Sequence, residues 1–372
     1  MDKEAKKRLR YTFPVDLRKL PRKSARSLWI GKIAEAGKDA YLDMDDLTVH
    51  LLAAGGTGSG KSVAAMGVVE ELLDKGIPVL VFDPTMQWTG FMKPCTEDHM
   101  TKFYEEFGMK KERAKAYKTN LIYVEDPDKF EIDVKKCMEK KGELTIFGIS
   151  KLRSGHMDKA VQKVIDSVFD ASLPESSQLK AMLVFDEVHR LLPKYGGTRG
   201  YISLERGMRE FRKWGLGMIM ISQVLSDFRG AVRANVGTEL QLRTKYSGDL
   251  NRVKEKYGGN YVKAVVKEGV GTALVQNSKY NDGLPYFIRF RPLLHSPHRI
   301  PEEELKVFKE FMNVIISLKK SAEELKAKGV DTSSIDLELT LAENKIKEGK
   351  TRMTQLYIDS VKKTIEKMQG KS

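Results

Sequence analysis

The sequence predicts an α/β fold in which a mostly parallel central sheet is flanked by helices, with a C-terminal helical appendage. Three observations support this prediction. Short apolar runs alternate with helical patterns up to about residue 300. A glycine-rich octet, residues 55–62, lies between one such run and a helical pattern. From Pro301 onward, apolar residues recur at spacings of three and four, which is typical of helices.

Most predicted strands are continuous apolar runs, which are typical of strands that helices cover on both faces. The run 47–54 (LTVHLLAA) leads into the glycine-rich octet. The other predicted strands are 27–34, 40–43, 77–83, 121–124, 144–149, 181–186, 216–222, 239–243, 272–276 and 285–291. Helical patterns such as 157–169 and 204–213 lie between them, and this alternation favours a parallel sheet.

Residues 55–62 read GGTGSGKS and match the phosphate-loop (P-loop) pattern G-x-x-x-x-G-K-[ST]. The glycines allow successive backbone N–H groups to point into one anion-binding concavity. Lys61 is placed to reach the β- and γ-phosphates, and Ser62 offers a hydroxyl ligand to Mg²⁺. A glycine-rich turn without a ligand is the alternative, but the flanking strand and helix favour a site for ATP and Mg²⁺. The residues expected to contact the nucleotide are Gly56, Thr57, Gly58, Ser59, Gly60, Lys61, Ser62 and Val63.

Polar residues follow two later strands at the points where those strands end. The run 181–186 ends in Asp186-Glu187, a pair in which Asp186 would hold Mg²⁺ through water and Glu187 would orient and deprotonate the attacking water. Gln223 follows the next strand and is expected to contact the γ-phosphate, although a surface glutamine would fit the same position. Asp83 is either a further acidic group near the site or a cap of the following turn.

The net charge of +14 is unevenly distributed. Residues 1–26 contain ten Lys/Arg and three Asp/Glu, and residues 193–245 contain ten and four. Clustered basic charge indicates a polyanionic partner, and a solvated tail plus an arginine-rich helix is the alternative.

Composition favours a cytoplasmic protein. No run approaches the roughly 18 consecutive apolar residues of a membrane span, and the charged N-terminus has no apolar region behind it, so no signal peptide is expected. The two cysteines, Cys95 and Cys137, lack metal-site spacing.

Three domains are expected along the chain. Residues 1–27 form a basic tail, 28–300 form the α/β domain, and 301–372 form the helical appendage. Gly329 ends the first helix of the appendage, and a second helix is expected to run to about Gly349. A third helix is expected beyond it, with apolar residues from Met353 to Met368 on one face. The appendage is either a surface for a partner or a unit packed on the main domain.

The motifs together resemble those of the HerA/FtsK superfamily of hexameric DNA-pumping ATPases. The residues that carry the resemblance are HLLAAGGTGSGKS, VLVFDP, LVFDEVHRLLP, FRKWGLGMIMISQ and ELQLRTK, in that order. Archaeal HerA helicases and conjugation ATPases are the most similar members. The resemblance covers residues 28–295 and implies a RecA-like P-loop NTPase core, a homo-hexameric ring, and double-stranded DNA as partner.

The resemblance also implies roles for basic residues. Arg243 matches the arginine that a neighbouring subunit contributes to the site, where a permanently charged guanidinium would neutralise the transferring phosphoryl group. Its rivals are Arg206, Arg209 and Arg212. The residues expected to grip DNA phosphates in the pore are Lys194, Arg199, Arg229 and Arg233. Phosphate contacts predict weak sequence preference and strong salt dependence.

Two departures from the family leave the function open. About 50 residues precede the P-loop, too few for the N-terminal barrel with which HerA helicases dock a nuclease, and the appendage has no counterpart assigned in the family. The first hypothesis is an ATP-hydrolysing ring that translocates double-stranded DNA. The second is an ATPase that energises conjugation, packaging or secretion, with a nuclease, conjugation or repair protein as partner. The third is an ATP-switched DNA-binding assembly module with little turnover.

Overall fold

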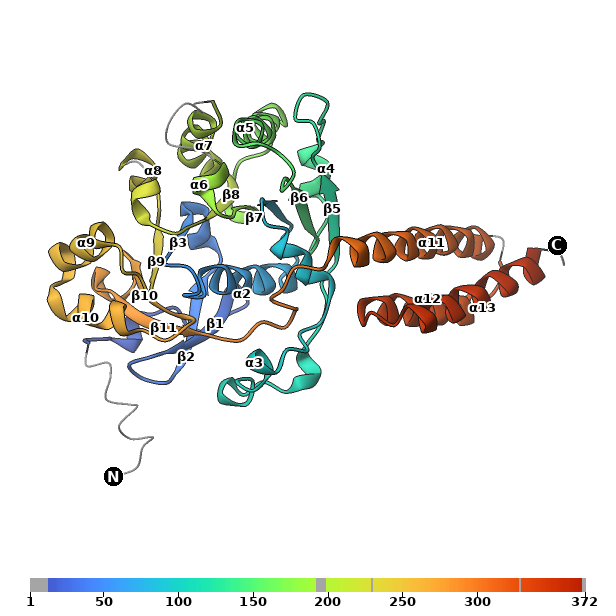
Figure 1. Ribbon diagram of the computed structural model, residues 1–372, viewed down its shortest axis with the longest axis horizontal. Helices are drawn as coiled ribbons and strands as arrows, with labels where there is room; N and C mark the ends of the chain where they lie inside the picture. The colour runs from blue at the N-terminus through green and yellow to red at the C-terminus, as the bar shows by residue number, and fades with distance from the viewer. Residues whose placement is uncertain (1–12, 192–198, 229, 328, 370–372) are drawn as a thin grey trace.

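One large sheet organises the molecule (Figure 1). The computed structural model describes residues 13–191, 199–228, 230–327 and 329–369. Within these residues the strands follow the order β2-β1-β11-β10-β9-β3-β8-β7-β4-β6-β5. Neighbours from β9 to β5 pair in parallel, and neighbours from β2 to β9 pair antiparallel. The predicted mostly parallel sheet is therefore confirmed.

The strands are short, as expected for a sheet covered by helices. Their bounds are β1 Ser27–Ile33, β2 Asp39–Asp43, β3 Leu51–Ala54, β4 Val79–Asp83, β5 Thr119–Tyr123, β6 Leu144–Gly148, β7 Ser176–Phe185, β8 Trp214–Ser222, β9 Thr238–Leu242, β10 Thr272–Asn277 and β11 Tyr286–Phe290. One prediction was wrong: residues 45–49 form a 3₁₀-helix, η2 (Asp45–Val49), so β3 begins only at Leu51. His50 separates the two, with φ of +64°, because its buried ring bridges the Met208 carbonyl and the Met218 N–H.

Helices fill the connections between strands and form the C-terminal part of the chain. Their bounds are α2 Lys61–Asp74, α3 Asp98–Thr101, α4 Val134–Met138, α5 Ser154–Asp170, α6 Val188–Leu191, α7 Arg199–Glu210, α8 Gly230–Ala234, α9 Ser247–Tyr257, α10 Gly259–Lys267, α11 Glu302–Ala327, α12 Ser333–Lys347 and α13 Thr351–Gln369. None of these described helices combines the length and the apolar character that a bilayer crossing requires.

Apolar side chains pack on both faces of the sheet. Leu51 and Ala53 of β3 join the cluster that includes α2, whereas Leu52 and Ala54 join the cluster that includes α5 and α7. This alternation follows from the two-residue repeat of a strand. Both faces of the central strands are therefore buried, which explains their continuous apolar sequence.

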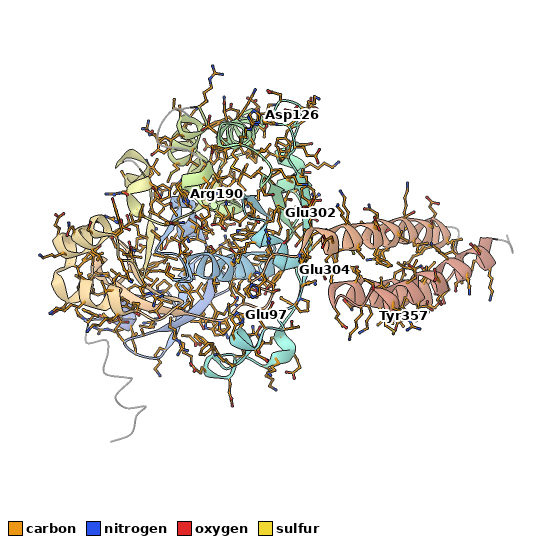
Figure 2. The ribbon with its side chains drawn as sticks, viewed as in Figure 1. Glu97, Asp126, Arg190, Glu302, Glu304 and Tyr357 are labelled. Carbon is orange, nitrogen blue, oxygen red and sulfur yellow. The ribbon has the colours of Figure 1, made fainter. Side chains whose placement is uncertain are left out.

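The C-terminal helices α11, α12 and α13 have an apolar cluster of their own and extend from one side of the sheet (Figure 1). Figure 2 shows Glu302 and Glu304 at the base of α11. These side chains pair with Lys151 and Lys93, respectively. The base of α11 also packs on the main domain, where Leu305 joins Met86 and Met92 in a small cluster, so the boundary near residue 300 stays a prediction.

Part of the predicted basic tail, residues 1–12, lies outside the described residues. From Phe13 the chain packs on the main domain. The Phe13 ring stacks on Tyr261, with ring centroids 4.1 Å apart, and the Asp16 N–H donates to Asn281 Oδ1 at 2.9 Å. These contacts place residues 13–16 against the segment around β11.

Candidate nucleotide-binding site

The P-loop joins β3 to α2 and is anchored to the ends of both neighbouring strands. Gly55 N–H donates to the Ser222 carbonyl at 3.4 Å, beyond β3 on one side. Gly56 N–H donates to the Arg243 carbonyl at 2.9 Å on the other side. Because β8, β3 and β9 are parallel, their carboxyl ends meet at this edge of the sheet. The edge is where ligands bind in open α/β sheets.

Two glycines of the loop are required for steric reasons. A Cβ atom on Gly55 would lie 2.7 Å from Ser59 Oγ, and one on Gly60 would lie 2.8 Å from the Gly271 nitrogen. Gly60 also has φ of +95°, a left-handed conformation that favours glycine. Gly271 N–H donates to the Ser59 carbonyl at 3.0 Å, so the start of β10 supports the loop from behind.

Lys61 and Glu187 lie together although 126 positions separate them in the sequence. Lys61 Nζ is 3.3 Å from Glu187 Oε1, and the lysine is only 7% exposed. His189 Nδ1 lies 3.3 Å from the other carboxylate oxygen of Glu187. Glu187 adopts φ of +47°, a conformation that costs a non-glycine residue about 1–3 kcal/mol and that clusters at functional sites.

Asp186 is more deeply buried than Glu187, the other member of the predicted acidic pair. It is 1% exposed, and its carboxylate accepts hydrogen bonds from Trp88 Nε1 at 2.9 Å and from the Glu187 N–H at 2.8 Å. Burial raises the pKa of Asp186 to about 7; the bond from Trp88 opposes this shift, and the charges of Asp83 and Glu187 add to it. Burial likewise raises the pKa of Asp83.

These residues fit a magnesium ion bound together with a nucleotide. Mg²⁺ is usually held by one or two carboxylates plus substrate phosphates rather than by a cage of protein ligands. Within the described residues, no group of three or more His, Cys, Asp or Glu side chains could hold a metal alone. Asp186 has no ion-pair partner among those residues, and because its pKa is raised to about 7, a bound metal ion would favour its ionised form. Ser62, at the second position of α2, would supply the hydroxyl ligand.

The other predicted site residues have different positions. Gln223 is exposed directly after β8, so its side chain is free to meet a ligand at the same edge. Arg243 is half-buried after β9, and its carbonyl contacts the P-loop of its own chain. That contact places Arg243 beside the P-loop, and its role in a neighbouring subunit's site stays a prediction.

Two of the predicted DNA-binding residues, Lys194 and Arg229, lie outside the described residues. Arg199 is exposed at the first position of α7, and Arg233 is half-buried in α8. The buried Nε of Arg233 has no hydrogen-bond partner among the described residues. No contact links either arginine to the P-loop in that part of the chain.

Sequence reasoning missed three residues of the site: Trp88, His189 and Gly271. Trp88 lies in η3 (Gln87–Met92), a short 3₁₀-helix after β4, where no spacing distinguishes it from a core aromatic residue. His189 follows the acidic pair by two positions, so proximity to Glu187 was the available signal. Gly271 contacts the P-loop across more than 200 residues of sequence, and no local pattern reports such a contact.

Comparison with known proteins agrees with this geometry. The profile of the family described as helicase HerA, central domain, matches residues 28–136, which contain the P-loop. This chain is similar to HerA. Residues 28–136 are similar to the central domain of HerA, and the resemblance found from the motifs is confirmed. No curated protein matches the sequence significantly.

Three solved structures that are similar to this chain have low sequence identity to it. The pCW3 conjugation coupling protein TcpA, in its monomer form with ATPγS, has 16% identity and a TM-score of 0.43, covering 76% of this chain and 70% of that chain. The genome packaging NTPase B204 of Sulfolobus turreted icosahedral virus 2, with AMPPCP, has 13% identity and a TM-score of 0.40, covering 66% and 97%. VirB4 of Thermoanaerobacter pseudethanolicus has 13% identity and a TM-score of 0.48, covering 73% and 98%. These identities are too low to transfer residue roles.

Proposed function

We propose that this chain hydrolyses Mg-ATP and uses the reaction to move double-stranded DNA through a ring of its own copies. One observation carries the hydrolysis part: the P-loop lysine, Lys61, and the acidic pair, Asp186 and Glu187, meet at the carboxyl edge of the sheet. A site for binding alone would not need a second carboxylate facing the P-loop lysine.

Each residue has a distinct task in this proposal. The backbone N–H groups of the P-loop and the start of α2 bind the phosphates. Bound Mg²⁺ would neutralise charge on the β- and γ-phosphates. Glu187, now paired with Lys61, orients and deprotonates the attacking water once Lys61 turns to the phosphates. Gln223, exposed after β8, contacts the γ-phosphate and responds to its loss.

The DNA part of the proposal depends on charge and on assembly. Lys194, Arg199, Arg229 and Arg233 are proposed to contact phosphates in the pore of a hexamer. Arg243 is proposed to act on the nucleotide of an adjacent subunit. The net charge of +14 supports a polyanionic partner, because clustered basic charge attracts polyanions regardless of sequence.

The proposal is tested by ATP hydrolysis with and without duplex DNA. We expect DNA to stimulate hydrolysis, and the stimulation to fall steeply with salt. Lys61→Ala should abolish turnover, whereas Lys75→Ala, just beyond the other end of α2, should retain it. Glu187→Gln should bind ATP without hydrolysing it, whereas Glu210→Gln on α7 should behave as wild type. Normal hydrolysis by Glu187→Gln would contradict the assignment.

A protein or protein–DNA cargo is the second candidate, and the C-terminal helices favour it. Four large apolar side chains on them are exposed: Ile316, Leu337, Met353 and Leu356. Exposed apolar residues of this kind suit contact with a protein partner. If this candidate is correct, a partner protein should remain bound after nuclease treatment, and removal of residues 301–372 should abolish its binding. Turnover far below one per minute in the presence of DNA would instead favour an ATP-switched assembly module.

A further inference from the structure

Trp88 links the ends of two neighbouring strands, β4 and β7, at the candidate site. Its indole Nε1–H donates to Asp186 Oδ2 at 2.9 Å, and its backbone N–H donates to Asp83 Oδ2 at 2.8 Å. Asp83 is the last residue of β4 and Asp186 directly follows β7. All three residues are no more than 1% exposed. One residue therefore holds two buried carboxylates by two separate donors.

The hydrogen bonds to Asp186 fix how its carboxylate is turned. Oδ2 accepts from Trp88 and Oδ1 accepts from the Glu187 N–H, so both oxygens have a donor. A carboxylate oxygen can accept more than one hydrogen bond or ligand contact. Each oxygen thus retains a position for a metal-bound water, while rotation of the carboxylate would break both existing bonds.

Trp88 is itself held by close packing of its own segment. Its ring stacks on Phe91 with centroids 5.5 Å apart, and Phe91 stacks on His295 at 3.5 Å. The segment after β11 also packs closely on η3. The Ile300 N–H donates to Thr89 Oγ1 at 2.9 Å, and a Cβ atom on Gly90 would lie 2.1 Å from the Ser296 carbonyl oxygen. The indole has little freedom to leave Asp186.

We propose that Trp88 is a positioning residue that orients Asp186 for Mg²⁺ bound with the nucleotide. This inference rests on the proposed function, because it assigns Trp88 to the same Mg-ATP site. A group that orients a metal ligand through a hydrogen bond typically contributes a factor of about 10–100 in metal affinity. Removal of the indole N–H should therefore weaken Mg²⁺ binding without weakening the metal-free contacts of the P-loop with phosphate.

The test measures the affinity for a fluorescent, non-hydrolysable ATP analogue with EDTA and across a Mg²⁺ titration. In Trp88→Phe we expect EDTA affinity within about twofold of wild type and a Mg²⁺ half-saturation raised about tenfold or more. Trp214→Phe is the matched control. Trp214 begins β8, whereas the other end of that strand, Ser222, lies at the P-loop, and Trp214 also packs on aromatic rings. This control should leave both values unchanged.

A second variant covers the case in which Trp88→Phe does not fold. The chain has three tryptophans, so in a Trp29→Phe/Trp214→Phe background only Trp88 remains to be replaced by a benzothienyl analogue, which substitutes sulfur for N–H. The same rise in Mg²⁺ half-saturation is expected. An unchanged half-saturation in either folded variant overturns the positioning role alone. Wild-type protein whose nucleotide affinity ignores Mg²⁺ overturns the proposed function as well.

Discussion

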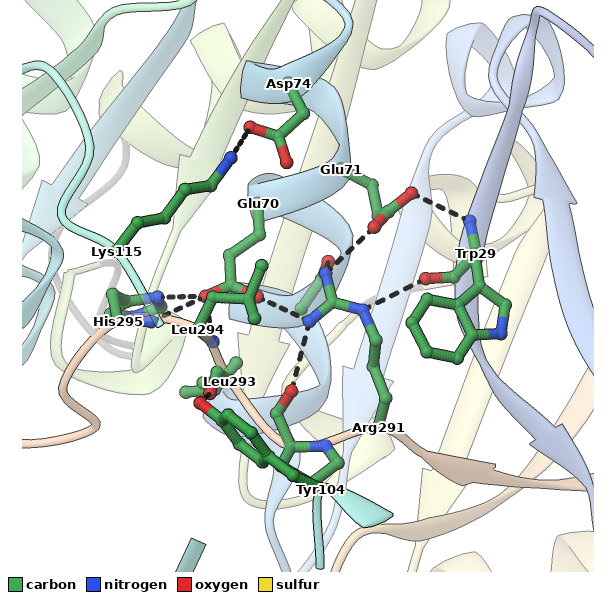
Figure 3. Close-up of polar contacts among 12 residues, drawn as sticks. Trp29, Glu70, Glu71, Asp74, Tyr104, Lys115, Arg291, Leu293, Leu294 and His295 are labelled. Atoms are coloured by element: carbon green, nitrogen blue, oxygen red, sulfur yellow. Dashed lines mark hydrogen bonds and ion pairs between the residues drawn. The ribbon is translucent and has the colours of Figure 1, made fainter. Parts of the chain in front are cut away.

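Glu70 and Asp186 are both buried carboxylates, yet their surroundings differ in charge. Glu70 in α2 is fully buried, and its oxygens contact Arg291 Nη1 and His295 Nδ1, each at 2.6 Å (Figure 3). Burial would raise the pKa of Glu70, but Arg291 and His295 outweigh it and lower the value to about 2. Asp186 receives neutral donors, and burial raises its pKa to about 7.

The difference separates a structural carboxylate from one suited to a ligand. Arg291 joins α2 to the end of β11 by contacting Glu70, Glu71 and the Trp29 carbonyl, so that charge is neutralised within the fold (Figure 3). At Asp186 no described residue provides a cation. A buried charge without a partner is costly, and proteins retain such charges at functional sites. In the proposed function, Mg²⁺ bound with the nucleotide would supply a cation at Asp186.

The largest expected effect comes from breaking the buried ion pair between Glu70 and Arg291. Arg291→Met would leave Glu70 buried without its guanidinium partner, and removal of one member of a buried pair typically destabilises by about 3–5 kcal/mol. Urea denaturation measures the free energy of unfolding. A loss below about 1 kcal/mol would show that the network is dispensable. Arg289→Met on β11, whose side chain is partly exposed, is the control and should cost less than about 1 kcal/mol.

The pH dependence of stability tests the lowered pKa of Glu70. Because the folded pKa of Glu70 lies below its unfolded value of 4.5, its ionisation stabilises the fold above pH 4.5. That contribution, about 3 kcal/mol from 1.36 kcal/mol per pKa unit, is lost as pH falls from 4.5 toward 2. The stability difference between wild type and Glu70→Gln should therefore shrink across this window. A constant difference would contradict the lowered pKa.

Neutralising Asp186 should separate activity from stability. Asp186→Asn removes the buried charge while keeping the size of the side chain, so we expect the free energy of unfolding to fall by no more than about 1 kcal/mol. Mg²⁺-dependent ATP hydrolysis should fall about 100-fold or more, since the metal ligand is lost. Steady-state hydrolysis and urea denaturation of the same preparation measure both. Destabilisation as large as in Arg291→Met would show that Asp186, like Glu70, is needed for the fold.

Glu35 sharpens the comparison, and its replacement has the smallest expected effect on ATP hydrolysis. It lacks a cationic partner in the described part of the chain, and burial raises its pKa to about 7, but it lies beside β11 rather than at the P-loop. Its ionisation opposes folding, so the free energy of unfolding should decline as pH rises from 4.5 to 7. Glu35→Gln should remove a decline of about 3 kcal/mol and leave ATP hydrolysis unchanged. Unchanged hydrolysis would show that an unpaired carboxylate alone does not mark the site, and reduced hydrolysis would contradict the distinction between Glu35 and Asp186.

Local patterns in the sequence were sufficient for much of the fold and for the core of the site. The P-loop and the acidic pair could be predicted because each depends on consecutive residues beside a strand. The mostly parallel pairing of the strands could be predicted from strand–helix alternation, and all three C-terminal helices could be predicted from their apolar spacing. These features are set by short-range physics.

Contacts between distant segments could not be predicted. Trp88 and Asp186 are 98 positions apart, and Glu70 and Arg291 are 221 apart, so no local spacing reports either pair. The false start of β3 has the same cause. Residues 47–50 are apolar enough for a strand, but His50 is held by Met208 and Met218 from other elements. Tertiary hydrogen bonds overrode the local preference there.

The central claim is that Asp186 holds, through water, the metal that accompanies ATP. Mn²⁺ can replace Mg²⁺ at such sites, and electron paramagnetic resonance counts the bound ions directly. With a non-hydrolysable ATP analogue, we predict one tightly bound Mn²⁺ per chain in wild type and in Glu35→Gln, and affinity weakened at least tenfold in Asp186→Asn. Equal Mn²⁺ affinity in wild type and Asp186→Asn would contradict the account.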